Sequence, residues 1–233
     1  MSYYYQDNSP RSGGFLSRIP PVTRNLIIIN VIIFVATIIN ENFMIGTFGL
    51  FYPTSPYFHW WQVVTHMFMH GGFWHIFFNM YTLFIFGVVV ENILGSKKFV
   101  LFYFICGLGA AALQIGTQYI EMQAFINAGT PQALESISQL KAIPTVGASG
   151  AIYGVLLGYA MLFPNSKMTL IFPPVTLSAK WMVIIFAAIE LFTGVVGWVD
   201  GVAHFAHLGG MLIGWLMILW WKKRRVLFDK TRI

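Results

Sequence analysis

Residues 147–163 read GASGAIYGVLLGYAMLF and contain no charged side chain. Glycine recurs at positions 150, 154 and 158, so a helix formed by this run would have one nearly flat face. Small residues four apart allow two membrane helices to approach backbone to backbone. We therefore predict a membrane helix here that packs closely against another helix, with Ser149 near its beginning.

Five further apolar runs surround this one in a chain of 233 residues, of which 57% are hydrophobic and only 9% charged. Soluble domains carry about 25% charged residues, so a water-soluble fold could not bury this much apolar surface. The runs are continuous, without the alternation of membrane β-strands, and a spanning helix needs roughly 20 residues. The sequence predicts an all-α membrane protein, a six-transmembrane-helix bundle with spans at about 25–40, 73–94, 98–119, 147–163, 180–197 and 202–221.

The positions of the basic residues agree with this count. With six alternating spans, every lysine and arginine except Lys141 falls on one side of the membrane. Since cytoplasmic loops carry an excess of these residues, we expect a multi-pass protein of the cell (inner) membrane with both termini cytoplasmic. The expected organisation is a flexible cytoplasmic tail (1–24), a six-helix domain (25–221) and a basic cytoplasmic tail (222–233).

Other features of the composition say less about function. The net charge of +6 is spread between and beyond the apolar runs, so we expect no nucleic-acid partner. Cys106, the only cysteine, lies in an apolar run and is expected to be a small packing residue. Of the two long outer connections, 41–72 is rich in aromatic residues and is expected to lie partly in the outer leaflet, whereas 120–146 reads as a polar, poorly patterned loop.

Polar groups inside the membrane are functional candidates, and three of them share one depth. Ser149 and His207 each lie 14 residues before the cytoplasmic end of their runs, and Asn79 lies 15 residues before its own. At 1.5 Å per residue, each is roughly 21–23 Å from the cytoplasmic side. Gly210 and Gly214 follow His207 on one face, so the two glycine-lined helices can bring Ser149 and His207 together.

These residue types suit acyl transfer. A serine hydroxyl is a weak nucleophile and needs an adjacent histidine to take its proton. The oxyanion that forms needs preorganised donors, which His75 and Asn79, one turn apart, could supply together with the backbone N–H of Ser149. Tyr153, one turn after Ser149, could pack against the histidine ring.

Three segments together resemble the rhomboid family of intramembrane serine proteases over about residues 25–221. They are HMFMHGGFWHIFFN (66–79), GASGAIYG (147–154) and AHLGGMLIG (206–214). The resemblance implies a Ser149–His207 dyad, oxyanion donors at His75 and Asn79, support from Tyr153 and from Gly147 of the Gly-x-Ser-Gly motif, and cleavage of membrane proteins near the outer face. It also suggests single-span substrates and a movable cap at 194–203, and it requires neither a cofactor nor a metal.

One feature departs from the family. Many members carry a Trp-Arg pair in the first loop, and the matching positions here read Trp61-Gln62. The role of that arginine therefore does not transfer to this chain.

Alternative functions are disfavoured by particular residues. A zinc protease would need a glutamate after His66, but the run to His70 is His-Met-Phe-Met-His. A catalytically inactive rhomboid-like protein that binds membrane clients would lack the serine or the histidine. A transporter would favour internal repeats, and this sequence has no convincing one. The nucleophile elbow of an α/β-hydrolase would need glycine at position 151, where this chain has alanine.

Two acids lie near the catalytic candidates. Glu190 is in the middle of the fifth run and is expected to hydrogen-bond to a neighbouring helix, with a catalytic role less favoured. Asp200 lies seven residues before His207 and could orient His204 or His207 to make a triad, although the neighbouring glycines favour a loop there.

Overall fold

The computed structural model describes residues 14–170, 174–196 and 203–227. Within these ranges regular structure is helical, apart from an isolated bridge and one antiparallel hairpin of β1 (Lys167–Thr169) and β2 (Thr176–Ser178). The helical elements are η1 (Phe15–Arg18), α1 (Pro21–Ile39), α2 (Glu41–Phe48), α3 (Gln62–Thr65), η2 (His66–Phe68), α4 (Phe73–Thr82), the π-helical turn η3 (Leu83–Gly87), α5 (Val88–Leu94), α6 (Ser96–Ala128), α7 (Pro131–Ala142), α8 (Ser149–Leu162), α9 (Ala179–Val196) and α10 (His204–Lys223).

Each predicted apolar run carries a helix, which confirms the all-α membrane bundle. In the described part of the chain, five helices are long and apolar enough to cross a membrane: Pro21–Ile39, Phe73–Leu94, Ser96–Ala128, Ala179–Val196 and His204–Lys223. The remaining helix, α8, is apolar but has 14 residues. It measures about 21 Å against a hydrocarbon core of roughly 30 Å, so the count of six spans stays a prediction.

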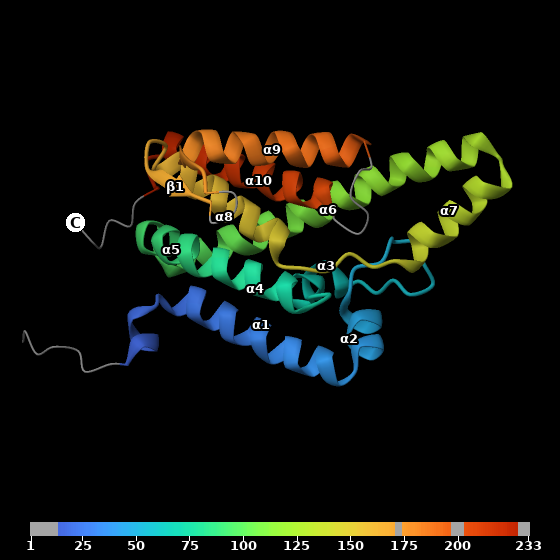
Figure 1. Ribbon diagram of the computed structural model, residues 1–233, viewed down its shortest axis with the longest axis horizontal. Helices are drawn as coiled ribbons and strands as arrows, with labels where there is room; N and C mark the ends of the chain where they lie inside the picture. The colour runs from blue at the N-terminus through green and yellow to red at the C-terminus, as the bar shows by residue number, and fades with distance from the viewer. Residues whose placement is uncertain (1–13, 171–173, 197–202, 228–233) are drawn as a thin grey trace, which may run out of the picture.

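The helices form a layered bundle with α8 near its middle. Figure 1 shows α1 along one side, then the continuous helix from α4 to α5, then α8, with α9 and α10 along the opposite side. Helices α6, α8 and α10 pack against one another. Ser149 of α8 and His207 of α10, which are far apart in the sequence, thereby lie side by side.

Glycines set the distance between α8 and α10. A Cβ at Gly210 would lie 1.8 Å from the carbonyl oxygen of Gly150, and one at Gly214 would lie 3.0 Å from that of Gly154. The two backbones are therefore in direct contact, as the glycine spacing predicts. Gly158, the third glycine of α8, instead makes room for the ring of Phe102 from α6.

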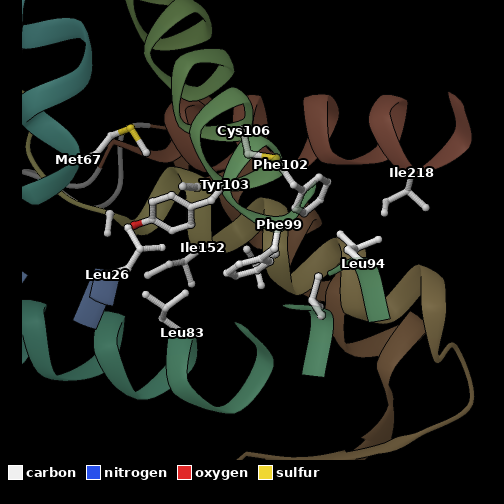
Figure 2. Close-up of a cluster of buried hydrophobic side chains, with 14 of the residues drawn as sticks. Leu26, Met67, Leu83, Leu94, Phe99, Phe102, Tyr103, Cys106, Ile152 and Ile218 are labelled. Carbon is white, nitrogen blue, oxygen red and sulfur yellow. The ribbon is translucent and has the colours of Figure 1, made fainter. Parts of the chain in front are cut away.

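Aromatic side chains of α6 fill the space around this contact. Phe99, Phe102 and Tyr103 have no exposed surface, and Figure 2 shows them with Cys106 between the surrounding helices. The Cys106 sulfur lies against Gly154, where a Cβ would come within 2.5 Å of it. Its place in the core confirms the packing role predicted for this cysteine.

A buried carboxylate joins α1 to the bundle. Glu91 of α5 is 1% exposed and accepts hydrogen bonds from the backbone N–H groups of Val22 and Thr23 in the first turn of α1. It also accepts from the hydroxyls of Thr23 and Ser96, each at 2.7 Å. The first N–H groups of a helix have no partner within the helix, and a carboxylate there also complements the helix dipole.

The connection 120–146 differs from the prediction of a poorly patterned loop. Helix α6 continues to Ala128, and α7 occupies Pro131–Ala142. Gly129 ends α6 with φ +60°, and the Thr130 side chain then caps α7 by accepting from the N–H of Ala133. A glycine just after a helix and a threonine-proline pair at the start of the next helix are local signals of helix ends. Hydropathy alone does not register these signals.

Gln62 anchors the connection 41–72, at the position where many members of the family that the sequence resembles have arginine. It is completely buried, and its amide nitrogen donates to the carbonyls of Thr47 and Tyr57. Its oxygen accepts from the N–H groups of Phe51 and His59. A neutral amide thus satisfies four backbone groups within this connection. Whether the connection enters the outer leaflet stays a prediction.

The contact between α8 and α10 predicts a specific loss of stability. Gly210→Ala forces a methyl group against the Gly150 carbonyl, and overpacking of this kind costs about 1–3 kcal/mol. We expect a lower melting temperature in detergent. Gly116→Ala is the control, because a Cβ at this position in α6 meets nothing within 4 Å. Equal melting temperatures in the two variants would contradict the backbone contact.

Candidate active site

Ser149 and His207 meet at the beginnings of two helices. Ser149 is the first residue of α8, and His207 lies in the first turn of α10. The Ser149 Oγ is 2.7 Å from His207 Nε2, a hydrogen-bonding distance. Because His207 is only 8% exposed, its ring has little freedom to leave this position. The arrangement allows the imidazole to accept the hydroxyl proton.

His75, in the first turn of α4, borders the same space. Its Nδ1 accepts a hydrogen bond of 3.3 Å from the backbone N–H of Gly71. A backbone N–H can only donate, so the neutral ring in this arrangement carries its proton on Nε2. A Cβ at Gly147 would lie 2.8 Å from His75 Nε2 and 3.5 Å from Ser149 Oγ. Both atoms therefore face one small space, which any side chain at position 147 would fill.

Gly147 is required by its backbone as well. Its φ of +128° lies in a region that residues with a side chain rarely adopt. Its N–H donates to the carbonyl of His66, which holds the segment before α8 against the connection 41–72. The glycine thus positions Ser149 and leaves room beside it.

Asn79 is one turn after His75. Its Nδ2 donates to the His75 carbonyl at 2.7 Å and retains a second N–H, while its Oδ1 has no hydrogen-bond partner among the described residues. His75, Asn79, Ser149 and His207 all line one open cavity of about 680 Å³. The residues that the sequence predicts at one depth, Ser149, His207 and Asn79, therefore do border a common space.

The same cavity is also lined by residues that the sequence analysis did not single out. They are Gln114 and Gln118 of α6 and the segment 143–146 before α8. Two amides four residues apart in an apolar helix lie on the same face, and this pattern in the sequence could have identified Gln114 and Gln118 as candidate site residues.

Tyr153 packs on the catalytic candidate as predicted. Its ring is stacked on His207, with centroids 4.2 Å apart and planes within 5° of parallel. Its hydroxyl donates to Glu190 Oε1 of α9 at 2.5 Å. All six site residues predicted from the sequence thus lie in one region, and their chemical roles stay predictions.

Glu190 bonds to neighbouring helices, as expected, and also reaches the candidate base. Its Oε2 is 2.6 Å from His204 Nδ1, and its Oε1 is 3.0 Å from His207 Nδ1. The sequence analysis did not assign His204 or Glu190 to the site. Asp200, considered there as an orienting acid, and the central part of the 194–203 cap lie outside the described residues.

His66 and His70 do not form a helical metal motif. The 3₁₀ turn η2 ends at Phe68, and Met69 is extended, so the two rings do not share one helix face. His66 Nδ1 lies 2.9 Å from the Gln62 carbonyl, and the His70 ring packs edge-on against His75. Burial lowers the pKa of His66 to about 4 and, with the nearby His75, lowers that of His70 to about 3. The described residues contain no cluster of three or more metal-ligating side chains.

Comparison with known proteins places the chain in a family. Residues 57–224 match the family model described as the Rhomboid domain. Rhomboid protease AarA of Providencia stuartii is 30% identical over 68% of this chain and 54% of its own length. RHOMBOID-like protein 6, mitochondrial, of Arabidopsis thaliana is 30% identical over 67% and 42% of the two chains.

A third relative is the presenilin-associated rhomboid-like protein, mitochondrial, of Rattus norvegicus, which is 32% identical over 69% of this chain and 39% of its own length. The chain therefore spans about half or less of the length of these three relatives. The family match covers most of the bundle and all the site residues described above. This membrane protein, with its serine and histidine at adjoining helix ends, belongs to the rhomboid family.

Proposed function

We propose that this chain is an intramembrane serine endopeptidase that cleaves membrane proteins near the outer leaflet. The observation that carries the proposal is the 2.7 Å contact between Ser149 Oγ and His207 Nε2, on helices held together by glycines. An adjacent base is what a serine hydroxyl needs to act as a nucleophile. The similarity to a relative named as a rhomboid protease supports the same conclusion.

The reaction would proceed through an acyl-enzyme. Ser149 Oγ forms a bond to the scissile carbonyl carbon while its proton moves to His207 Nε2, and the carbonyl electron pair moves onto oxygen. The oxyanion then collapses, the C–N bond breaks, and the leaving amine takes the proton from His207. A water molecule attacks the Ser149 ester in the same way and releases the acid.

The oxyanion would be held by groups around Gly147. His75 Nε2–H, the free N–H of Asn79 and the backbone N–H of Ser149 are the candidate donors. The missing side chain at Gly147 leaves room beside His75 Nε2 and Ser149 Oγ. Donors fixed before charge develops stabilise the transition state without having to reorganise. Tyr153 would support this step by keeping the His207 ring in one orientation through stacking.

Substrates and location complete the proposal. We propose that the substrates are membrane proteins, single-span ones among them, and that they reach Ser149 through the open cavity. The distribution of basic residues supports a cell-membrane location with both termini cytoplasmic. The proposed layout is a six-helix domain between two cytoplasmic tails. Helix α1 begins at Pro21 and α10 ends at Lys223, so the helical domain starts before the expected residue 25 and ends after the expected residue 221. The reaction needs no metal or cofactor, since the chain itself supplies nucleophile, base and oxyanion donors.

Removing either member of the dyad tests the mechanism directly. Ser149→Ala and His207→Ala should each abolish cleavage of a single-span test protein by the purified chain, by up to about 10⁶-fold in kcat. The double variant should be no worse than either single variant, because the two groups act as a unit. Ser138→Ala, at an exposed serine of α7, is the control and should cleave normally. Substantial cleavage by Ser149→Ala would refute the assignment.

The oxyanion donors should affect a different kinetic parameter. His75→Ala and Asn79→Ala should lower kcat and leave KM nearly unchanged, because the donors act as charge develops. One such donor is worth about 10²–10³ in kcat, and sharing among three groups reduces the individual loss. If the two residues only tie α4 to its neighbours, activity will fall in proportion to melting temperature. Normal kcat in both variants would exclude them from the mechanism.

The orientation can be tested with introduced cysteines. Ser138→Cys and Lys97→Cys lie at exposed positions, on α7 and at the start of α6, and native Cys106 is fully buried. A membrane-impermeant maleimide should label position 138 in intact cells and position 97 only after permeabilisation. The reverse pattern would invert the proposed topology, and equal labelling of both would contradict a span between them.

A further inference from the structure

Glu190 is at the centre of a polar cluster built from three helices. The residue lies on α9, is only 7% exposed and is surrounded by apolar helices. Three side chains that can donate hydrogen bonds face its carboxylate: Tyr153 from α8, and His204 and His207 from α10. An ionised carboxylate is an acceptor with about four lone-pair sites, so it can receive all three donors. The carboxylate thus has enough acceptor sites for all three side chains.

The position of Glu190 relative to His207 matters for catalysis. His207 Nε2 faces the Ser149 hydroxyl and must be unprotonated to take the proton. The neutral ring then carries its own proton on Nδ1, and the Glu190 Oε1 lies 3.0 Å from that nitrogen. The angle is not that of a straight hydrogen bond. Catalytic hydrogen bonds in free enzymes are often poorly aligned and tighten when substrate binds.

We propose that Glu190 is a positioning residue that extends the Ser149–His207 pair into a triad. Its carboxylate holds the His207 proton on Nδ1 and stabilises the imidazolium that forms when Nε2 receives the serine proton. Glu190 keeps its charge throughout, and the Nε2 proton passes on to the leaving amine. This inference rests on the proposed serine endopeptidase function.

Two contacts hold the carboxylate for this task. His204 Nδ1 binds the oxygen that His207 does not face, at 2.6 Å, and Thr193 Oγ1 lies 3.1 Å from the same His204 nitrogen. The Tyr153 hydroxyl binds the oxygen that faces His207, while the Tyr153 ring stacks on the imidazole. Tyr153 therefore contacts both Glu190 and His207 and helps to hold them in place, as expected for a site with a prearranged base.

The competing explanation is a purely structural tie between α9 and the bundle. Much of α9 is exposed and apolar, as at Ile184, Ile189 and Leu191, so a polar tie would help to hold the helix in place. A tie of this kind stabilises the fold and has no influence on which nitrogen of His207 carries the proton. The two explanations therefore differ in kinetics and in the histidine tautomer.

Kinetics of three Glu190 variants provide the first test. Glu190→Leu removes the acceptor, and we expect a loss of at least about 10²-fold in kcat, the lower end of what a general base contributes. Glu190→Gln keeps the volume and one acceptor oxygen and should be intermediate. Glu190→Asp should recover part of the activity through its charge. The rate at which a fluorophosphonate labels Ser149 should follow the same order, and KM should change little.

Glu91→Gln is the matched control, since it makes the same change at a buried carboxylate on the far side of the bundle. It should lower the melting temperature without lowering the kcat of the folded protein. Glu190→Leu with the kcat and labelling rate of wild type would overturn the inference. If Glu190→Leu does not fold, the same comparison is made with Glu190→Gln, and wild-type kcat there overturns it equally.

The tautomer of His207 distinguishes the two explanations, because a purely structural role of Glu190 would not affect which ring nitrogen carries the proton. In protein labelled with ¹⁵N-histidine, the signal assigned through a His207→Asn variant should report an Nδ1–H ring in wild type and a mixture in Glu190→Gln. An unchanged tautomer would overturn the positioning role. Wild-type protein that neither cleaves nor reacts with fluorophosphonate would instead refute the proposed function, so the two failures are distinguishable.

Discussion

Direct backbone contact between α8 and α10 is the constraint on which the site depends. The carbonyl oxygen of Gly150 lies where a Cβ of Gly210 would be, and this contact leaves no tolerance for a larger residue. Ser149 directly precedes Gly150, and His207 lies three residues before Gly210, so the approach of the two backbones also sets the distance between hydroxyl and imidazole. In a membrane, where lipid is as apolar as the side chains, such close packing supplies much of the attraction between helices.

Two buried carboxylates, Glu91 and Glu190, are both well partnered but have different kinds of partner. Glu91 accepts four hydrogen bonds and joins the start of α1 to the bundle, which accounts for its burial by structure alone. Glu190 is nearly as well partnered, but two of its partners are histidines and one of these faces Ser149. Because unpartnered polar groups are costly away from water, partnering is expected for both. The identity of the partners distinguishes a structural acid from a proposed functional one.

Hydropathy and motif spacing predicted the helices and the main site residues, and they failed where order comes from capping and polar contacts. Hydropathy predicts a loop at 120–146, yet Gly129, Thr130 and Pro131 end one helix and begin the next. Gln62, which in the sequence is only a departure from the family, satisfies four backbone groups of the connection 41–72. Such contacts depend on partners far away or on local conformations that hydropathy does not register.

The sequence by itself determined the class of protein, the positions of the apolar helices and the candidates Ser149, His207, His75 and Asn79. This was possible because hydrophobicity, helical rise and glycine spacing are properties of one segment and do not depend on its neighbours. Only the tertiary structure decided that Glu190 of α9 lies beside His207. Helix rotation and lateral order are set by packing among several segments, so depth estimates from one helix at a time could not show which side chains of α9 face inward.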